Sequence, residues 1–98
     1  MTLSVMEFPM TTKVLAVDDE PNVLRLLQTK LLKAGFEVIT ARDGEEGLRL
    51  AISDKPDVVV LDVMMPKMDG YTALHEIKTQ LDPPPIVVML TAKGQAKD

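Results

Sequence analysis

The chain has no cysteine, no excess of basic residues and no long apolar run. Without cysteine it can form neither a disulfide framework nor a thiol nucleophile, which fits a cytoplasmic location. Its 11 Lys and Arg are scattered and outnumbered by 15 Asp and Glu, whereas a nucleic-acid surface needs clustered positive charge. Residues 1–12 have neither a basic start nor a sustained apolar segment. We therefore expect a flexible N-terminal leader there, with no secretory signal, no membrane span and no direct contact with nucleic acid.

The chain does have enough apolar content for one hydrophobic core. Its 98 residues are 46% hydrophobic and 27% charged, which is the balance of a single globular domain, here expected over residues 13–98. Between short apolar runs lie segments whose apolar residues recur every three or four positions, which predicts helices. The runs are expected to form strands, and they span Lys13–Val17, Glu37–Thr40, Val58–Leu61 and Ile86–Leu90.

The helical segments have clear start and stop signals. Pro21 suits a first helical turn, and Gly35 supplies a left-handed stop. Asp43 and Glu46 have capping-box spacing, and Pro83–Pro85 prevents continuation of the last helix. The expected helices run from Pro21 to Ala34, from the Asp43 cap to about Asp54, and from the Asp69-Gly70 cap to about Leu81. The side chains expected to face the core are Val23, Leu24, Leu27, Leu31, Leu48, Ala51, Ile52, Tyr71, Leu74, Ile77 and Leu81.

This alternation of strands and helices over short loops predicts an α/β fold. Its sheet is expected to be parallel and doubly wound, with helices on both faces. Val58–Leu61 is apolar at every position, as suits a central parallel strand. The strand Ile86–Leu90 would be left as an exposed apolar edge.

Three aspartates lie where expected strands end. Asp18 and Asp19 follow the first apolar run, and Asp62 follows the third. Ligands bind outside the carboxyl ends of the strands in parallel sheets, so we expect the three carboxylates to share one pocket. Like charges about 4 Å apart repel by roughly 4 kcal/mol at an effective dielectric near 20, and a bound Mg²⁺ would relieve that repulsion.

Each aspartate also has a purely structural interpretation. Asp18, Asp19 and Glu20 could cap the helix that starts at Pro21 and complement its dipole. Asp62 could be a turn residue. Capping gives no reason for a carboxylate at the end of the neighbouring strand as well, so a shared pocket explains more of the pattern.

Three motifs at the expected strand ends carry a family resemblance. Together and in this order they resemble the receiver domain of two-component response regulators, from about Lys13 to Asp98. The resemblance implies a flavodoxin-like receiver fold that has its first four strands, three helices and the start of a fourth helix. The motifs are Val14-Leu15-Ala16-Val17-Asp18-Asp19-Glu20, Val60-Leu61-Asp62-Val63-Met64-Met65-Pro66-Lys67-Met68-Asp69-Gly70 and Met89-Leu90-Thr91-Ala92.

The resemblance implies roles for five residues. Asp62 would be the phosphoacceptor that attacks the phosphohistidine of a sensor histidine kinase or a phosphotransfer protein. Asp18 and Asp19 would hold Mg²⁺ with Asp62 and the backbone carbonyl of Met64, and Thr91 would be the switch hydroxyl. Mg²⁺ prefers oxygen ligands and neutralises charge during phosphoryl transfer. Such a domain is a signalling switch, not an enzyme, although it can catalyse its own phosphorylation and dephosphorylation.

One part of the family pattern is absent from this sequence. Receivers continue through a fifth strand, which ends in a lysine that contacts the phosphoryl group, and a fifth helix. Lys93 and Lys97 lie too early to be that lysine. Loss of one preorganised donor costs on the order of 3 kcal/mol. We therefore expect a truncated receiver in which phosphorylation is slowed and switching is impaired.

Two other functions stay open at this point. The first is an interaction module that forms a homodimer through the exposed strand Ile86–Leu90. The second is an Mg²⁺-dependent phosphatase with an aspartyl-phosphate intermediate. Such haloacid-dehalogenase-like enzymes usually carry an Asp-x-Asp motif after the first strand, whereas here Asp18 and Asp19 are adjacent and Asp62 lies on another strand.

Overall fold

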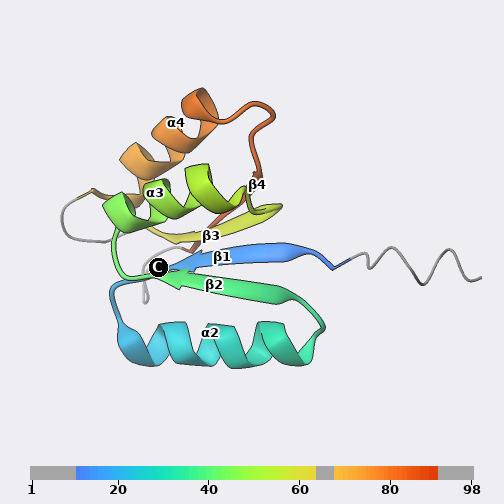
Figure 1. The fold of residues 1–98 in the computed structure, drawn as a ribbon. Coiled ribbons are helices and arrows are strands. Elements are labelled where there is room, and N and C mark those ends of the chain that lie inside the picture. Colours follow the sequence, from blue (N-terminus) through green and yellow to red (C-terminus); the bar gives the residue numbers. More distant parts are fainter. Residues whose placement is uncertain (1–10, 64–67, 91–98) are drawn as a thin grey trace, which may run out of the picture.

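The computed structural model describes residues 11–63 and 68–90. In these residues one parallel sheet lies between helices on both faces (Figure 1), which confirms the predicted α/β fold. The leader before residue 11, Met64 and Thr91 lie outside the described residues. The strands are β1 (Lys13–Val17), β2 (Glu37–Ala41), β3 (Val58–Asp62) and β4 (Ile86–Leu90), and the helices are α2 (Pro21–Lys33), α3 (Gly44–Asp54) and α4 (Gly70–Gln80).

The order of the strands brings the carriers of the three aspartates together. The sheet has the order β2-β1-β3-β4, so β1 and β3 are neighbours in its interior. All pairings are parallel, and Val17 at the end of β1 lies beside Leu61 on β3. Asp18 follows Val17, and Asp62 is the last residue of β3, which continues one residue beyond the expected Leu61, so both aspartates lie at the same edge of the sheet.

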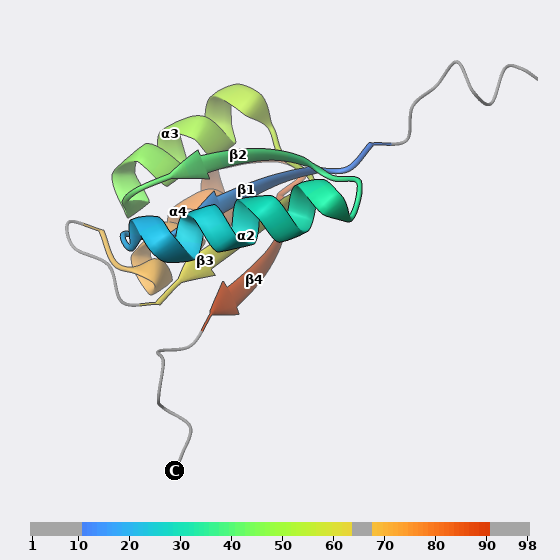
Figure 2. The same ribbon diagram turned by 90° about the horizontal axis from the view of Figure 1, so that it is seen from below.

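The two faces of the sheet are covered unequally. Helices α3 and α4 lie on one face, while α2 lies on the other and contacts β1 and β2. In Figure 2, β4 extends beyond the part of the sheet that α2 covers. The larger core cluster lies under α3 and α4 and contains Leu15, Val17, Ala41, Ala51, Val59, Leu61, Ala73 and Ile77. On the other face, Ile86 and Val88 of β4 are 66% and 45% exposed.

The helix signals read from the sequence are confirmed with small shifts. Gly35 has a positive φ of 97° after α2, which ends at Lys33 and not at Ala34. The Asp43 carboxylate accepts a 2.8 Å hydrogen bond from the Glu46 backbone N–H. The Glu46 carboxylate in turn accepts a bond from the N–H of Arg42, so the reciprocal bond goes to the residue before the cap and not to the N–H of Asp43 itself.

Two side chains that were expected in the core are exposed. Ile52 on α3 is 43% exposed and Tyr71 on α4 is 65% exposed. Gly70, Ala73 and Ile77 form the buried stripe of α4, and Tyr71 lies about 100° around the helix from Gly70. Ile52 lies just beyond the buried stripe of α3, which Gly44, Gly47 and Ala51 form. Strand β2 also continues one residue further than expected, to Ala41.

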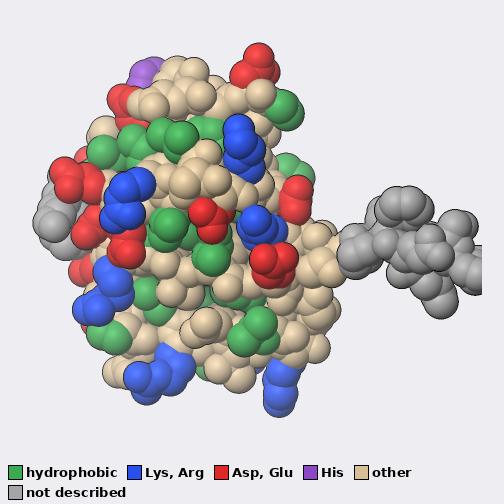
Figure 3. Space-filling view, viewed as in Figure 1, with side chains coloured by type: hydrophobic (Ala, Val, Ile, Leu, Met, Phe, Trp, Pro, Cys, Tyr) green, Lys and Arg blue, Asp and Glu red, His purple; other side chains and the backbone are tan. Residues whose placement is uncertain are grey.

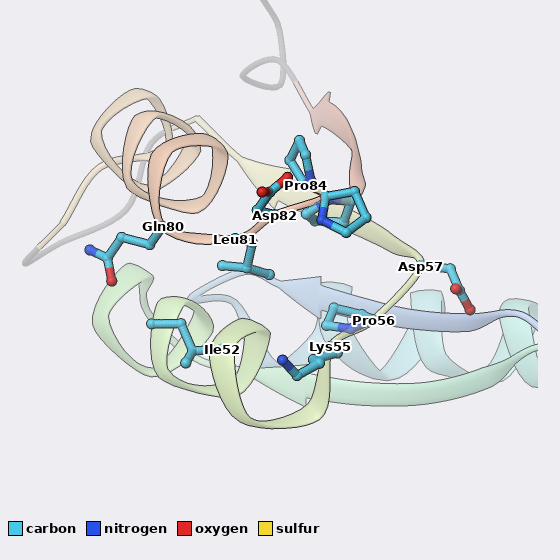
Figure 4. A pocket seen from close by; sticks show the side chains of 10 residues that line it. Ile52, Lys55, Pro56, Asp57, Gln80, Leu81, Asp82 and Pro84 are labelled. Carbon is cyan, nitrogen blue, oxygen red and sulfur yellow. The ribbon is translucent and has the colours of Figure 1, made fainter.

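A groove lies at the opposite edge of the sheet from the aspartates (Figure 4). It has a volume of about 470 Å³. Its residues precede β3 and β4 or end α3 and α4, and Leu81 lies between the ends of these two helices. The exposed Ile52 is at its rim. The lining residues are Ile52, Lys55, Pro56, Asp57, Gln80, Leu81, Asp82, Pro83, Pro84 and Pro85.

The basic side chains are scattered over the surface (Figure 3), as their distribution along the sequence predicted. On the face drawn in Figure 3, Lys and Arg side chains stand apart from one another, and Asp and Glu gather toward the side where the strands end. Within residues 11–63 and 68–90, none of the helices combines the length and the hydrophobicity that a membrane crossing requires.

Candidate metal centre

The carboxyl edge of β1 and β3 holds a cluster of three carboxylates. Each of Asp18, Asp19 and Asp62 offers one oxygen, and these oxygens lie within 4.8 Å of one another. Asp18 and Asp62 are 3% and 2% exposed, and Asp19 is half-buried. The expected shared pocket is therefore present, and it is built from two neighbouring strands.

Backbone hydrogen bonds fix the place of Asp18. Its N–H donates to the Ala41 carbonyl oxygen at 3.1 Å, which extends the pairing of β1 with β2 by one residue. Its Oδ1 accepts a 2.9 Å bond from the Glu20 N–H, which forms the turn before α2. Glu20 is the N-cap residue of that helix, and its own side chain makes no capping bond. Asp18 thus supports the turn before the helix in addition to joining the cluster.

Asp62 is held by the sheet on one side and by the start of α4 on the other. It lies beside Leu90 in the parallel register, and the next N–H, that of Val63, donates to the Leu90 carbonyl at 3.1 Å. The Gly70 N–H donates to the Val63 carbonyl, also at 3.1 Å. A side chain at Gly70 would overlap the Asp62 carbonyl oxygen. The backbone of Asp62 therefore has little freedom to move.

The donor set of the cluster fits a small hard cation. The cluster offers carboxylate oxygens, which Mg²⁺ prefers; Mg²⁺ typically binds one or two protein carboxylates directly and keeps several waters, through which a third carboxylate can be held. Two of the three carboxylates are buried, where the repulsion between like charges is screened less than in water. A divalent cation would offset that repulsion. Asp18, Asp19 and Asp62 are the residues that would hold it.

Reasoning from the sequence identified the acids of the cluster but missed two glycines at the starts of the neighbouring helices. Gly44 and Gly70 open α3 and α4, and each lies in contact with backbone atoms near the cluster. The available signal was the repeated pair Asp-Gly at positions 43–44 and 69–70. The aspartate of each pair explains the cap, but a glycine in a first helical turn needs a reason of its own, because it is a weak helix former.

Comparison with known proteins places this chain in one family. The family model of the response regulator receiver domain matches residues 14–98. The chain is 50% identical over 86 residues to the probable transcriptional regulator ycf27 of Guillardia theta. This matched region covers 88% of this chain and 33% of that protein. It is 48% identical over 89 residues to the alkaline phosphatase synthesis transcriptional regulatory protein PhoP of Bacillus subtilis, covering 91% and 37%. The chain thus spans about a third of the length of these relatives.

Solved structures give the same result. Response regulator protein TrrA of Thermotoga maritima, in complex with Mg(2+)-BeF, superposes with a TM-score of 0.80 at 37% identity, covering 85% of this chain and 71% of that one. CheY of Borrelia burgdorferi, from a CheX-CheY-BeF3-Mg+2 complex, gives a TM-score of 0.79 at 38% identity, covering 87% and 65%. On the match of the family model, the two relatives and the two structures, this chain belongs to the family of response regulator receiver domains.

Proposed function

We propose that this chain accepts a phosphoryl group on Asp62 as a switch in two-component signal transduction. The donor is the phosphohistidine of a sensor histidine kinase or a phosphotransfer protein. The observation that carries this proposal is the cluster of three carboxylates within 4.8 Å, two of them buried, at the carboxyl edge of adjacent strands. The family membership supports it, because the family name describes domains that receive a signal.

The proposed reaction follows from the place of Asp62. One carboxylate oxygen forms a bond to phosphorus, the bond from phosphorus to the imidazole nitrogen of the donor histidine breaks, and the imidazole keeps the electron pair and takes up a proton. The product on Asp62 is an acyl phosphate. Mg²⁺, when bound, would neutralise charge on the phosphoryl oxygens. Asp18 and Asp19 would hold the cation on the β1 side, and Asp62 would hold it from β3.

Two further residues are proposed on the family pattern alone. The Met64 carbonyl would complete the protein ligands of Mg²⁺, and the Thr91 hydroxyl would bond a phosphoryl oxygen as the switch. Both positions lie outside the described residues. We place the domain in the cytoplasm, without direct contact to nucleic acid, as a signalling module that is not an enzyme for an external substrate. Autophosphorylation and autodephosphorylation at Asp62 remain part of the proposal.

The test is an intact-mass spectrum after incubation with Mg²⁺ and a small acyl-phosphate donor. We expect the unsubstituted protein to gain one phosphoryl group and Asp62→Ala to gain none. The matched control is Asp57→Ala, because Asp57 precedes β3 at the opposite edge of the sheet, and it should be modified like the unsubstituted protein once its folding is verified. Equal modification of Asp62→Ala would show that another residue is the acceptor.

A second candidate function is self-association through β4. Ile86 and Val88 are 66% and 45% exposed on the face of the sheet beside α2, and β4 is at the end of the described sheet. An exposed apolar edge strand is a template for pairing with another chain. We propose that a second copy pairs there in a two-fold arrangement, in which the same residues of both copies meet.

A further inference from the structure

Two helices start beside the acidic cluster, and each starts with a buried glycine. Gly44 follows the Asp43 cap and opens α3, and Gly70 follows the Asp69 cap and opens α4. The two helices pack against each other on the same face of the sheet. Glycine is less favourable than alanine in a helix, so a glycine at both starts points to a packing requirement.

Gly44 lies directly against the backbone of Met68. A Cβ atom at position 44 would overlap the Met68 carbonyl oxygen, and it would lie 2.8 Å from the Met68 Cβ and 3.1 Å from its carbonyl carbon. Two of these three atoms belong to the backbone, so the Met68 peptide itself would have to move. Only a residue without a side chain allows α3 to approach Met68 this closely.

Met68 begins a short segment that is tied to Asp62. Asp69 accepts a 2.8 Å hydrogen bond from the first turn of α4 and so fixes the start of that helix. The Gly70 N–H donates to the Val63 carbonyl at 3.1 Å, and a Cβ at Gly70 would overlap the Asp62 carbonyl oxygen and lie 2.8 Å from the Val63 Cα. Gly70 follows Met68 by two residues, so a displacement of Met68 would be passed through Gly70 to the backbone of Asp62.

The same buried stripe of α3 also packs against Val17, the last residue of β1, which Asp18 follows. Gly47 lies one turn further along α3, and a Cβ there would be 2.9 and 3.1 Å from the two methyl carbons of Val17. The Asp18 N–H also donates to the carbonyl of Ala41, shortly before α3 begins. A shift of α3 away from Met68 would therefore reach the end of β1 through the packing against Val17 and through the hydrogen bond between Asp18 and Ala41.

We propose that Gly44 is a positioning residue of the acidic cluster. By letting the start of α3 fit between Val17 and Met68, it sets how close the end of β1, with Asp18 and Asp19, lies to Asp62. A side chain at position 44 pushes these two parts of the cluster apart and weakens the binding of a divalent cation. The inference rests on the proposed role of the cluster as an Mg²⁺ site.

The test compares Gly44→Ala with Glu45→Ala by calorimetric titration with Mg²⁺ alone. Both changes place alanine in the first turn of α3. At position 44 the added methyl group meets backbone atoms of Met68, whereas Glu45 is exposed and its replacement adds no atom to a packed contact. We expect Gly44→Ala to weaken Mg²⁺ affinity about tenfold, as loss of supporting interactions around a metal site typically does. Glu45→Ala is expected to change it about twofold at most.

Urea unfolding in the presence of a chelator measures the stability of each variant without bound metal. A merely structural role of Gly44 would change this unfolding free energy and leave the Mg²⁺ affinity of the folded protein unchanged.

A folded Gly44→Ala that binds Mg²⁺ as tightly as the unsubstituted protein overturns the inference. Failure of the unsubstituted protein to bind Mg²⁺ overturns the proposed function instead. If Gly44→Ala does not fold, Met68→Gly replaces it, since it removes the Cβ that faces Gly44 and loosens the segment. Unchanged affinity in that variant rejects the inference as well.

Discussion

Asp19 adds a third negative charge next to two buried carboxylates. Its side chain is half-buried, and its cluster oxygen lies within 4.8 Å of those of Asp18 and Asp62. At that separation and an effective dielectric near 20, each ionised pair repels by about 3 kcal/mol before screening by solvent. The fold tolerates this arrangement, which is the expected state of a site that takes up a cation.

Asp19→Asn keeps the size of the side chain and removes its charge. We expect the Mg²⁺ affinity to fall about tenfold. The free energy of unfolding in a chelator should rise by about 1 kcal/mol, because repulsion within the cluster is relieved. Calorimetric titration and urea unfolding measure the two quantities. Glu37→Gln is the matched control, since Glu37 is exposed at the start of β2, and a loss of stability in Asp19→Asn would mean that the side chain mainly supports the turn.

At the residue scale, the sequence predicted where the acidic side chains lie, but not which residues far apart in the chain come into close contact. Asp18, Asp19 and Asp62 could be placed because apolar runs mark strand ends, and the carboxyl ends of parallel strands meet at one edge. The contact of Gly44 with Met68 joins residues 24 positions apart. No local pattern encodes such an approach, because it depends on how α3 settles against the segment before α4.

At the scale of elements, the helical spacing and the short apolar runs predicted the helices and strands found in residues 11–63 and 68–90, but not every inward side chain. Ala73 and Ile77 lie at the centre of the buried stripe of α4, whereas Tyr71 lies outside it. A helix can rotate by a fraction of a turn without changing its apolar periodicity, so residues at the margin of a stripe are assigned by tertiary packing. Ile52 is exposed for the same reason, because Gly47 and Ala51 bring α3 close to the sheet.

The exposed residues of β4 lead to a prediction about assembly. We expect sedimentation velocity to show a concentration-dependent dimer, and Val88→Lys to shift it to monomer, because a buried lysine pair would be desolvated and repel across the two-fold axis. The control is Leu32→Lys on α2, since Leu32 is 52% exposed and lies outside the sheet. A strictly monomeric unsubstituted protein at high concentration would remove this second function.

At the scale of the whole molecule, the proposed metal site would couple cation binding to folding. Its three carboxylates come together only when β1 and β3 pair, so a cation that binds the folded state and not the unfolded chain stabilises the fold by mass action. A single domain of this size shows a large response of its melting temperature to small changes in free energy.

Mg²⁺ at about a hundred times its dissociation constant should add about 2.7 kcal/mol, which corresponds to a rise in Tm of about 13 °C. Removal of the metal with a chelator should reverse the rise, as followed by circular dichroism. Asp62→Ala should lose most of it, and Na⁺ at equal ionic strength serves as the control for general screening. An equal rise in the two proteins would place the cation elsewhere.

The strand order has a consequence for how the molecule opens. Strands β1 and β3 are hydrogen-bonded on both sides, whereas β2 and β4 end the described sheet. Amide protons of interior strands exchange with solvent mainly through global opening, and those of terminal strands through local fraying. The aspartates at the ends of β1 and β3 are thus attached to the strands that we expect to exchange most slowly, and fraying of the outer strands would leave the three carboxylates in register.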